Sequence, residues 1–333
     1  DLVRSRGLGD VYKRQVSYLF IQERGYMVNN QINDIKKEIS KAIVGKENII
    51  DKVLAAIFAG GHVLLEDVPG VGKTTLALAF AKTLSLEYKR IQFTPDVLPS
   101  DVVGFSMFNK KINDFEFREG AAMCNILLAD EINRTSPKTQ AALLEVMEEG
   151  KVTVDGTTHY LPDPFFVIAT QNPMGYVGTQ KLPESQLDRF MIKMSMGYPD
   201  EKSEIDIYNG RSYSALDEVR KVISSEDIVN IRKTVENVHI DEKLMEYLVR
   251  IVRLSRENQY VSLGISPRGG IALVKMSKST AYMNGRDYVI PEDILECIDS
   301  VAEHRLVLNS KAKANGYTEQ DIINDLKDRI AVP

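Results

Sequence analysis

The feature that most constrains the fold of this chain is a glycine-rich segment at residues 67–75, which reads DVPGVGKTT. The apolar run Val63–Glu66 comes directly before it, and Leu76, Phe80 and Leu84 follow it at a spacing of four residues. This order predicts a strand, a loop and a helix with one buried face. The backbone N–H groups of such a loop and the N-terminus of such a helix attract anions. The segment therefore predicts a phosphate-binding loop.

Each part of this loop has an expected task. Lys73 is expected to reach the β and γ phosphates of a nucleotide, and the Thr74 hydroxyl to coordinate Mg²⁺. The residues expected to contact the nucleotide are Pro69, Gly70, Val71, Gly72, Lys73, Thr74 and Thr75. Asp67 occupies the position of the first glycine in the pattern G-x-x-x-x-G-K-[ST], so the strict pattern fails at one end. The alternative interpretation is a chance Gly-Lys-Thr in a surface turn.

A second motif ends a predicted strand with two carboxylates, because the apolar run at 126–129 leads into Asp130 and Glu131. Asp130 is expected to bind the metal ion through a water, and Glu131 to act on the attacking water as its base. Such an acidic strand end is common on its own. Together with the phosphate-binding loop upstream, it predicts Mg²⁺-dependent hydrolysis of ATP.

Three further polar residues are candidates for the same chemistry. Asn172 follows a predicted strand at 165–170 and could bind the γ-phosphate or orient the water, although an Asn-Pro turn also explains it. The departing phosphate needs positive charge, which an arginine of a neighbouring subunit can supply. Arg189 and Arg268 are the candidates, but most single arginines are solvated or form salt bridges, so residue type alone leaves both open.

The rest of the chain alternates predicted strands and helices. Further strands are expected at 89–93, 126–130 and 165–170, which is typical of a parallel sheet covered on both faces, an αβα sandwich. Two hairpin inserts are expected, at 105–117 and 151–161, the second with Asp155-Gly156 in a type I′ turn. Beyond Pro199 helical periods take over. We therefore expect an α/β nucleotide-binding core at 27–198 and a smaller all-helical domain at 199–333.

The composition of the 333 residues limits the possible functions. Apolar residues make up 44% and charged residues 27%, which is typical of a soluble globular protein. No apolar run approaches the roughly 20 residues that a membrane span needs. Cys124 and Cys297 are far apart, which favours a reducing cytoplasmic compartment. The net charge of −5 argues against a surface devoted to nucleic acid.

Residues 1–26 are excluded from the predicted fold. Residues 1–15 are basic and lack helix or strand periodicity, and 10–15 can be encoded by the end of a sequencing adaptor. An amphipathic pattern of isoleucines begins soon after Met27. We expect the first segment to be an artefact and Met27 to be the true start; a short basic tail is the alternative.

Together these motifs make the chain resemble the MoxR family of AAA+ ATPases, which are P-loop NTPases, from Ile39 to Val332. The segments that carry the resemblance are IVG at 43–45, GGHVLLE at 60–66, the phosphate-binding loop, TPD at 94–96, PSD at 99–101, DEINR at 130–134, ATQNP at 169–173, and the segment that runs from LPE at 182–184 to Phe190. The resemblance implies an αβα core followed by a helical lid.

The resemblance also implies roles for individual residues. It makes Asn172 the sensor 1 residue, Arg189 an arginine finger acting across a subunit boundary and Arg268 the sensor 2 arginine of the lid. It places Val44 and Gly45 near the adenine, and it places both hairpins where they face the ring or its substrate.

At the level of function, the resemblance implies a homo-hexameric ring that remodels or matures partner complexes, together with a protein that carries a von Willebrand factor A domain. A nucleic-acid motor and an ATP-binding switch remain as alternatives. The second hairpin tip, VDGTTH at 154–159, has no Lys or Arg, which argues against the motor, although Lys110 and Lys111 lie on the first insert. Glu131 and Asn172 argue against a switch without turnover.

Overall fold

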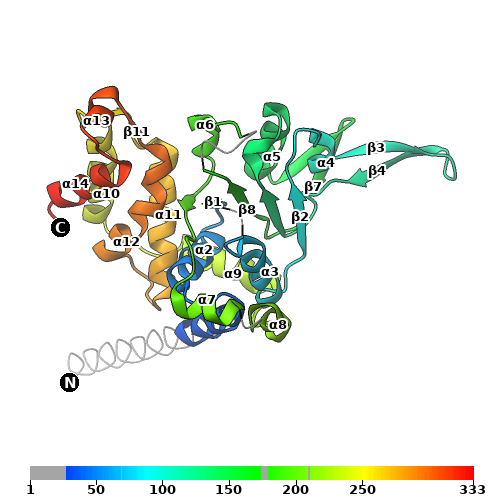
Figure 1. Cartoon of the computed structure of the whole chain (residues 1–333), viewed down its shortest axis with the longest axis horizontal. Helices are drawn as coiled ribbons and strands as arrows, with labels where there is room; N and C mark the ends of the chain where they lie inside the picture. Colours follow the sequence, from blue (N-terminus) through cyan, green and yellow to red (C-terminus); the bar gives the residue numbers. More distant parts are fainter. Residues whose placement is uncertain (1–27, 69, 174–178, 209–210) are drawn as a thin grey trace, which may run out of the picture.

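The computed structural model describes residues 28–68, 70–173, 179–208 and 211–333. The expectations for residues 1–26 and for Pro69 lie outside this set. Among the described residues, a parallel sheet is flanked by helices, and the helices of the C-terminal third pack at one side of it (Figure 1). No helix in these ranges is long and apolar enough to cross a membrane.

The central sheet has five parallel strands in the order β2-β5-β8-β1-β9. Their bounds are β1 Val63–Glu66, β2 Tyr88–Gln92, β5 Ile126–Asp130, β8 Phe166–Gln171 and β9 Ile192–Met194. Four of the five are close to the predicted strands. The fifth, β9, was not predicted because its three residues are too few to show a pattern. The carboxyl ends of β1, β5 and β8 lie side by side, so the residues that follow them share one edge of the sheet.

Helices cover both faces of this sheet. Residues 28–42 are helical, and the further elements of this part are α2 Glu47–Phe58, α3 Lys73–Thr83, α4 Pro99–Val103, α5 Pro137–Glu149, α6 Glu184–Leu187 and a 3₁₀ turn at Ile132–Arg134. Alternate residues of the strands enter two separate apolar clusters. Leu128 and Ile168 belong to the cluster of α2 and α3, whereas Leu127 and Val167 belong to that of α5. The predicted αβα sandwich is confirmed.

Both predicted hairpins are present. The first consists of β3 Gly104–Asn109 and β4 Asp114–Glu119 and projects from the body of the molecule (Figure 1), and the second of β6 Lys151–Val154 and β7 Thr157–Tyr160. Asp155 and Gly156 have φ angles of 48° and 80°, as a type I′ turn requires. The hairpins touch, because the Phe117 ring stacks on His159 with centroids 3.7 Å apart.

The C-terminal part is mainly helical. Its helices are α7 Glu201–Tyr208, α8 Arg211–Glu218, α9 Ser225–Glu236, α10 Glu242–Glu257, α11 Pro267–Met283, α12 Pro291–Ala302, α13 Ser310–Ala314 and α14 Glu319–Arg329. Pro267 and Pro291 begin helices as predicted. The lid was expected to be all-helical, but it also contains a two-stranded antiparallel ribbon of β10 Val261–Leu263 and β11 Val307–Leu308. These strands pair residues far apart in sequence, which a local pattern does not reveal.

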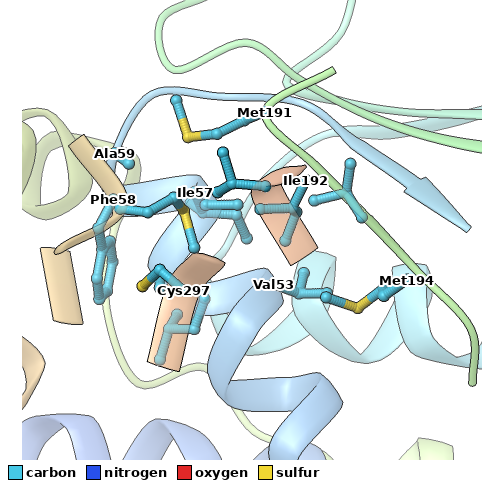
Figure 2. Packing of buried hydrophobic residues seen from close by; sticks show 14 of the residues in the cluster. Val53, Ile57, Phe58, Ala59, Met191, Ile192, Met194 and Cys297 are labelled. Carbon is cyan, nitrogen blue, oxygen red and sulfur yellow. The ribbon is translucent and has the colours of Figure 1, made fainter. Parts of the chain in front are cut away.

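Helix α2 connects the sheet to the lid. Figure 2 shows Val53, Ile57 and Phe58 of α2 beside Ile192 of β9 and Cys297 of α12. On its other flank, the Ser279 hydroxyl of α11 donates to the Ala55 carbonyl at 2.8 Å. One apolar cluster thus extends from the sheet into the lid and packs the two parts against each other.

Candidate nucleotide-binding and hydrolysis site

The phosphate-binding loop has the backbone that its glycines predict. Gly70 and Gly72 have φ angles of 90° and 94°, in the region that L side chains rarely adopt, and a Cβ at either would meet nothing within 4 Å. The two glycines are therefore required by backbone conformation and not by crowding. Helix α3 begins directly after Gly72 without a side-chain cap, so its first N–H groups remain available to an anion.

Lys73 is held over the loop that it follows. It is buried, and its Nζ donates to the Asp67 carbonyl at 2.9 Å and to the Val68 carbonyl at 3.4 Å. Burial lowers the pKa of the Lys73 ammonium, while three nearby carboxylates oppose the shift. The ammonium thus points into the loop, where a bound phosphate could replace the carbonyl acceptors.

Two adjoining cavities meet at this loop. The first, of about 530 Å³, is lined by Gly70, Gly72, Lys73, Thr74, Thr75, Leu78, Arg90, Gln92, Asp130, Glu131 and Leu216. The second, of about 140 Å³, is lined by Ala42, Ile43, Val44, Lys46, Gly70, Val71, Gly72, Thr75, Met196, Pro199, Ser203 and Ile207. The first contains the charged side chains of Lys73, Arg90, Asp130 and Glu131, whereas most side chains of the second are apolar and only Lys46 is charged. The two cavities share the loop glycines. This pair fits a ligand with an anionic part and a flat apolar part.

The two residues expected near the adenine lie at the apolar cavity. Val44 lines it. Gly45 has a φ angle of 71°, and a Cβ there would come within 2.7 Å of the Ser203 hydroxyl of α7. The segment before α2 and the start of the lid helices therefore meet at Gly45.

Asp130 is fixed by two partners on neighbouring strands. Its Oδ1 accepts from the Thr170 hydroxyl at 2.6 Å, and its Oδ2 accepts from Nη2 of Arg90 at 2.7 Å. Thr170 also accepts from the Glu131 N–H at 2.9 Å, so one buried hydroxyl positions both acidic residues. Sequence patterns revealed neither Arg90 nor Thr170, since both act across strands whose order the sequence does not state.

The oxygen ligands present fit Mg²⁺. The Thr74 hydroxyl and the Asp130 carboxylate line the same cavity as the loop, and Mg²⁺ prefers one or two protein oxygens, phosphates and waters over a protein cage. The described ranges hold no group of three His, Cys, Asp or Glu that could enclose a metal ion.

Glu131 and Asn172 are brought together. The Glu131 backbone has a φ angle of 57°, which turns its side chain to accept from Nδ2 of Asn172 at 3.0 Å and from Nη1 of Arg134 at 2.9 Å. Asn133 accepts from the Asn172 N–H at 3.4 Å and donates to its carbonyl at 3.1 Å. No donor among the described residues reaches Asn172 Oδ1, which is buried. Its side chain therefore has a place beside Glu131 that a plain Asn-Pro turn would not require.

Neither predicted arginine lines these cavities. Arg189 and Arg268 both bind Glu148 of α5, through Nη1 and Nη2 respectively, each at 2.5 Å, and Arg189 also donates to the Leu144 carbonyl at 3.0 Å. The structure thus brings the two arginines together at the Glu148 carboxylate and not at the cavities beside the phosphate-binding loop. Glu148 was not singled out in the sequence because acidic residues are common on exposed helix faces.

Two family models match the chain: the ATPase family associated with various cellular activities (AAA) over residues 62–192, and the AAA lid domain over residues 253–326. The chain is 50% identical over 298 residues to uncharacterized protein YeaC of Bacillus subtilis, covering 89% of this chain and 93% of that protein. It is 37% identical over 305 residues to Chaperone MoxR1 of Mycobacterium tuberculosis, covering 89% and 81%. A solved candidate ATPase from Cytophaga hutchinsonii has a TM-score of 0.87 at 38% identity, covering 95% and 99%.

The parallel sheet, the phosphate-binding loop after β1 and the lid define a P-loop NTPase of the AAA+ class. Within that class, the chain belongs to the MoxR family of AAA+ ATPases. It is therefore an ATPase of the MoxR type, and nucleotide binding follows from the family.

Proposed function

We propose that the chain hydrolyses ATP to ADP and phosphate with Mg²⁺ and uses this reaction to remodel or mature partner proteins. The observation that carries the proposal is that Lys73, Asp130 and Glu131 line the larger cavity together, with Asn172 hydrogen-bonded to Glu131. Glu131 and Asn172 bind each other there, which a nucleotide-controlled switch without turnover does not need. The buried thiols of Cys124 and Cys297, whose pKa values burial raises to about 12, are suited to a reducing cytoplasm.

Each residue has a task in the proposed reaction. Lys73 binds the β and γ phosphates, and Thr74 and Asp130 hold Mg²⁺, which supplies positive charge to the phosphates. Glu131 accepts a proton from the attacking water, and Asn172 orients that water. The oxygens of the Glu131 carboxylate each accept one hydrogen bond, from Asn172 and from Arg134, which leaves acceptor sites for that water.

Arg189 and Arg268 support an assembly in which they act on the nucleotide of a neighbouring subunit. Their side chains are 32% and 45% exposed, and they lie together at Glu148, outside their own subunit's cavities. We propose a homo-hexameric ring in which both guanidiniums reach the γ-phosphate of the next subunit. Glu148 would then hold the pair ready at the subunit surface.

The hairpins favour a protein client over nucleic acid. Phe105, Phe108, Ile112, Phe115 and Tyr160 are exposed apolar residues on them. Arg118 is paired with Glu116 and Lys151 with Glu149, so Lys110 and Lys111 at the tip of the first hairpin are the remaining lysines for phosphates. A relative is named a chaperone, and the family resemblance implies partners with a von Willebrand factor A domain. We propose such a protein as the client or co-factor of the ring.

Glu131→Gln tests the proposal directly. The variant should bind ATP with the wild-type Kd and lose hydrolysis by about 100-fold or more, because the general base is removed while the shape is kept. Calorimetry and phosphate release measure the two effects. Lys73→Ala is the matched comparison, since it should weaken binding itself. Wild-type turnover by Glu131→Gln would contradict the catalytic role. If ATP-loaded Glu131→Gln retains DNA in physiological salt but no protein, the motor function is correct instead.

A further inference from the structure

Asp67, the residue that departs from the glycine pattern of the loop, has a set of partners of its own. Its carboxylate is buried and accepts three hydrogen bonds, from the Ser195 hydroxyl at 2.6 Å, the Met196 N–H at 2.6 Å and the Gly197 N–H at 3.0 Å. A glycine would leave all three donors without this acceptor. The departure from the pattern therefore adds a contact that the pattern itself cannot make.

The partners of Asp67 belong to the segment at 195–200, which leaves β9 and enters α7. Met196 and Pro199 of this segment line the apolar cavity. Lys46, which also lines this cavity, donates to the Tyr198 carbonyl of the segment at 2.8 Å. The segment is thus one wall of the apolar cavity, and Asp67 is its attachment to the phosphate-binding loop.

The same residue also touches the phosphate side of the site. While its carboxylate holds the wall, its backbone carbonyl accepts from Nζ of Lys73 at 2.9 Å. A carboxylate that accepts backbone N–H groups forms charge-assisted bonds, about twice as strong as neutral ones. Asp67 therefore joins the anionic cavity to the apolar cavity at a fixed separation.

We propose that Asp67 is a positioning residue that sets the wall at 195–200 at the distance from the loop at which one nucleotide fills both cavities. This inference rests on the proposed function, since it assumes that the ligand has a base and phosphates. It makes Asp67 matter for binding a whole nucleotide and not for binding phosphate alone.

Asp67→Asn tests this proposal, because the amide keeps the size of the side chain and replaces an acceptor oxygen by a donor. Calorimetry with Mg²⁺ should show a Kd for ATP raised by about tenfold, whereas the Kd for inorganic tripolyphosphate stays unchanged. In steady-state hydrolysis KM should rise while kcat is kept. Ser195→Ala removes a single donor and should shift ATP binding in the same direction by less. Asp293→Asn is the matched control, because Asp293 is also buried, accepts from the Ile290 N–H and from the Arg286 guanidinium, and lines neither cavity.

The outcomes separate the possibilities. Equal loss of affinity for ATP and tripolyphosphate would show that Asp67 shapes only the phosphate-binding loop. Unchanged affinity for both would show that the contact of Asp67 with the segment at 195–200 does not contribute to nucleotide binding. Either result overturns the proposal. If Asp67→Asn does not fold, as thermal unfolding would reveal, unchanged ATP binding by Ser195→Ala would overturn it. Wild-type protein that binds tripolyphosphate but not ATP would instead contradict the proposed function.

Discussion

The buried hydroxyl of Thr170 positions two acidic residues. It donates to Asp130 and accepts from the backbone of Glu131, so it fixes the end of β5 against the end of β8. Asn133 has the corresponding task for Asn172. The residues expected to do the chemistry are thus positioned by neighbours that line neither cavity.

Thr170→Val should show this dependence, because valine has the same shape and makes neither hydrogen bond. We expect kcat to fall by about tenfold or more as the two carboxylates lose their orientation, with the Kd for ATP little changed. Phosphate release and calorimetry are the measurements. Thr83→Val is the matched control, since Thr83 is equally buried and its hydroxyl has no partner among the described residues. An equal loss of kcat in both variants would contradict the positioning role.

A buried histidine gives the fold a pH dependence. His62 accepts from the Val167 N–H through Nδ1 at 3.1 Å, so Nε2 carries the hydrogen and donates to the Met147 carbonyl at 3.0 Å. Burial lowers the pKa of His62 to about 4. In the unfolded chain His62 has an ordinary pKa of about 6.5. Between pH 6.5 and pH 4, His62 is therefore protonated in the unfolded chain but neutral in the folded chain. Stability that is fully present above pH 6.5 is lost as the pH falls toward 4.

The expected slope is about 1.4 kcal/mol of unfolding free energy per pH unit from each such histidine. His304 is buried in the same way, and burial likewise lowers its pKa. Denaturant unfolding at pH 7 and pH 5.5 measures the effect. His62→Gln should flatten the slope, whereas His239→Gln, at an exposed position, should leave it unchanged. A His62→Gln slope equal to the wild-type slope would show that His62 does not carry the effect.

At the scale of elements, α2 is the helix on which both parts of the molecule depend. Ile57→Ala in α2 should cost about 2–5 kcal/mol, because the side chain is fully buried among β9 and the lid and its removal leaves a cavity. The free energy of unfolding in denaturant is the measurement. Val249→Ala on the exposed face of α10 is the control and should change it little. A loss of less than about 0.5 kcal/mol in Ile57→Ala would contradict the packing role.

The elements also show which parts of the site could be predicted from sequence. The phosphate-binding loop and the acidic end of β5 are each formed by a continuous stretch of sequence, so motif and flanking pattern were enough to predict them. Arg90, Thr170 and Arg134 could not be predicted, because their contacts depend on which strands are neighbours. The task of Asp67 was hidden for the same reason, since its partners follow a three-residue strand more than 120 residues later.

At the scale of the whole molecule, the two arginines are the feature that a single subunit does not explain. Arg189 lies between α6 and β9 and Arg268 lies in the first turn of α11, so they come from the core and the lid, yet both bind Glu148. A change in the angle between core and lid would separate them. A ring that uses both guanidiniums on one neighbouring nucleotide would therefore couple hydrolysis to the placement of the lid.

Arg189→Ala tests whether the catalytic charge comes from the next subunit. The variant should bind ATP with the wild-type Kd and lose hydrolysis by about 10³-fold, as the loss of an arginine finger does. Mixing it with Glu131→Gln should restore part of the activity, because some interfaces then pair an intact Glu131 with an intact Arg189 of the neighbour. Arg253→Ala, an exposed arginine of α10 with a distant ion pair, is the control. Recovery in the mixture can only arise if the two residues act across a subunit boundary, whereas full hydrolysis by Arg189→Ala alone would mean that each subunit completes its own site.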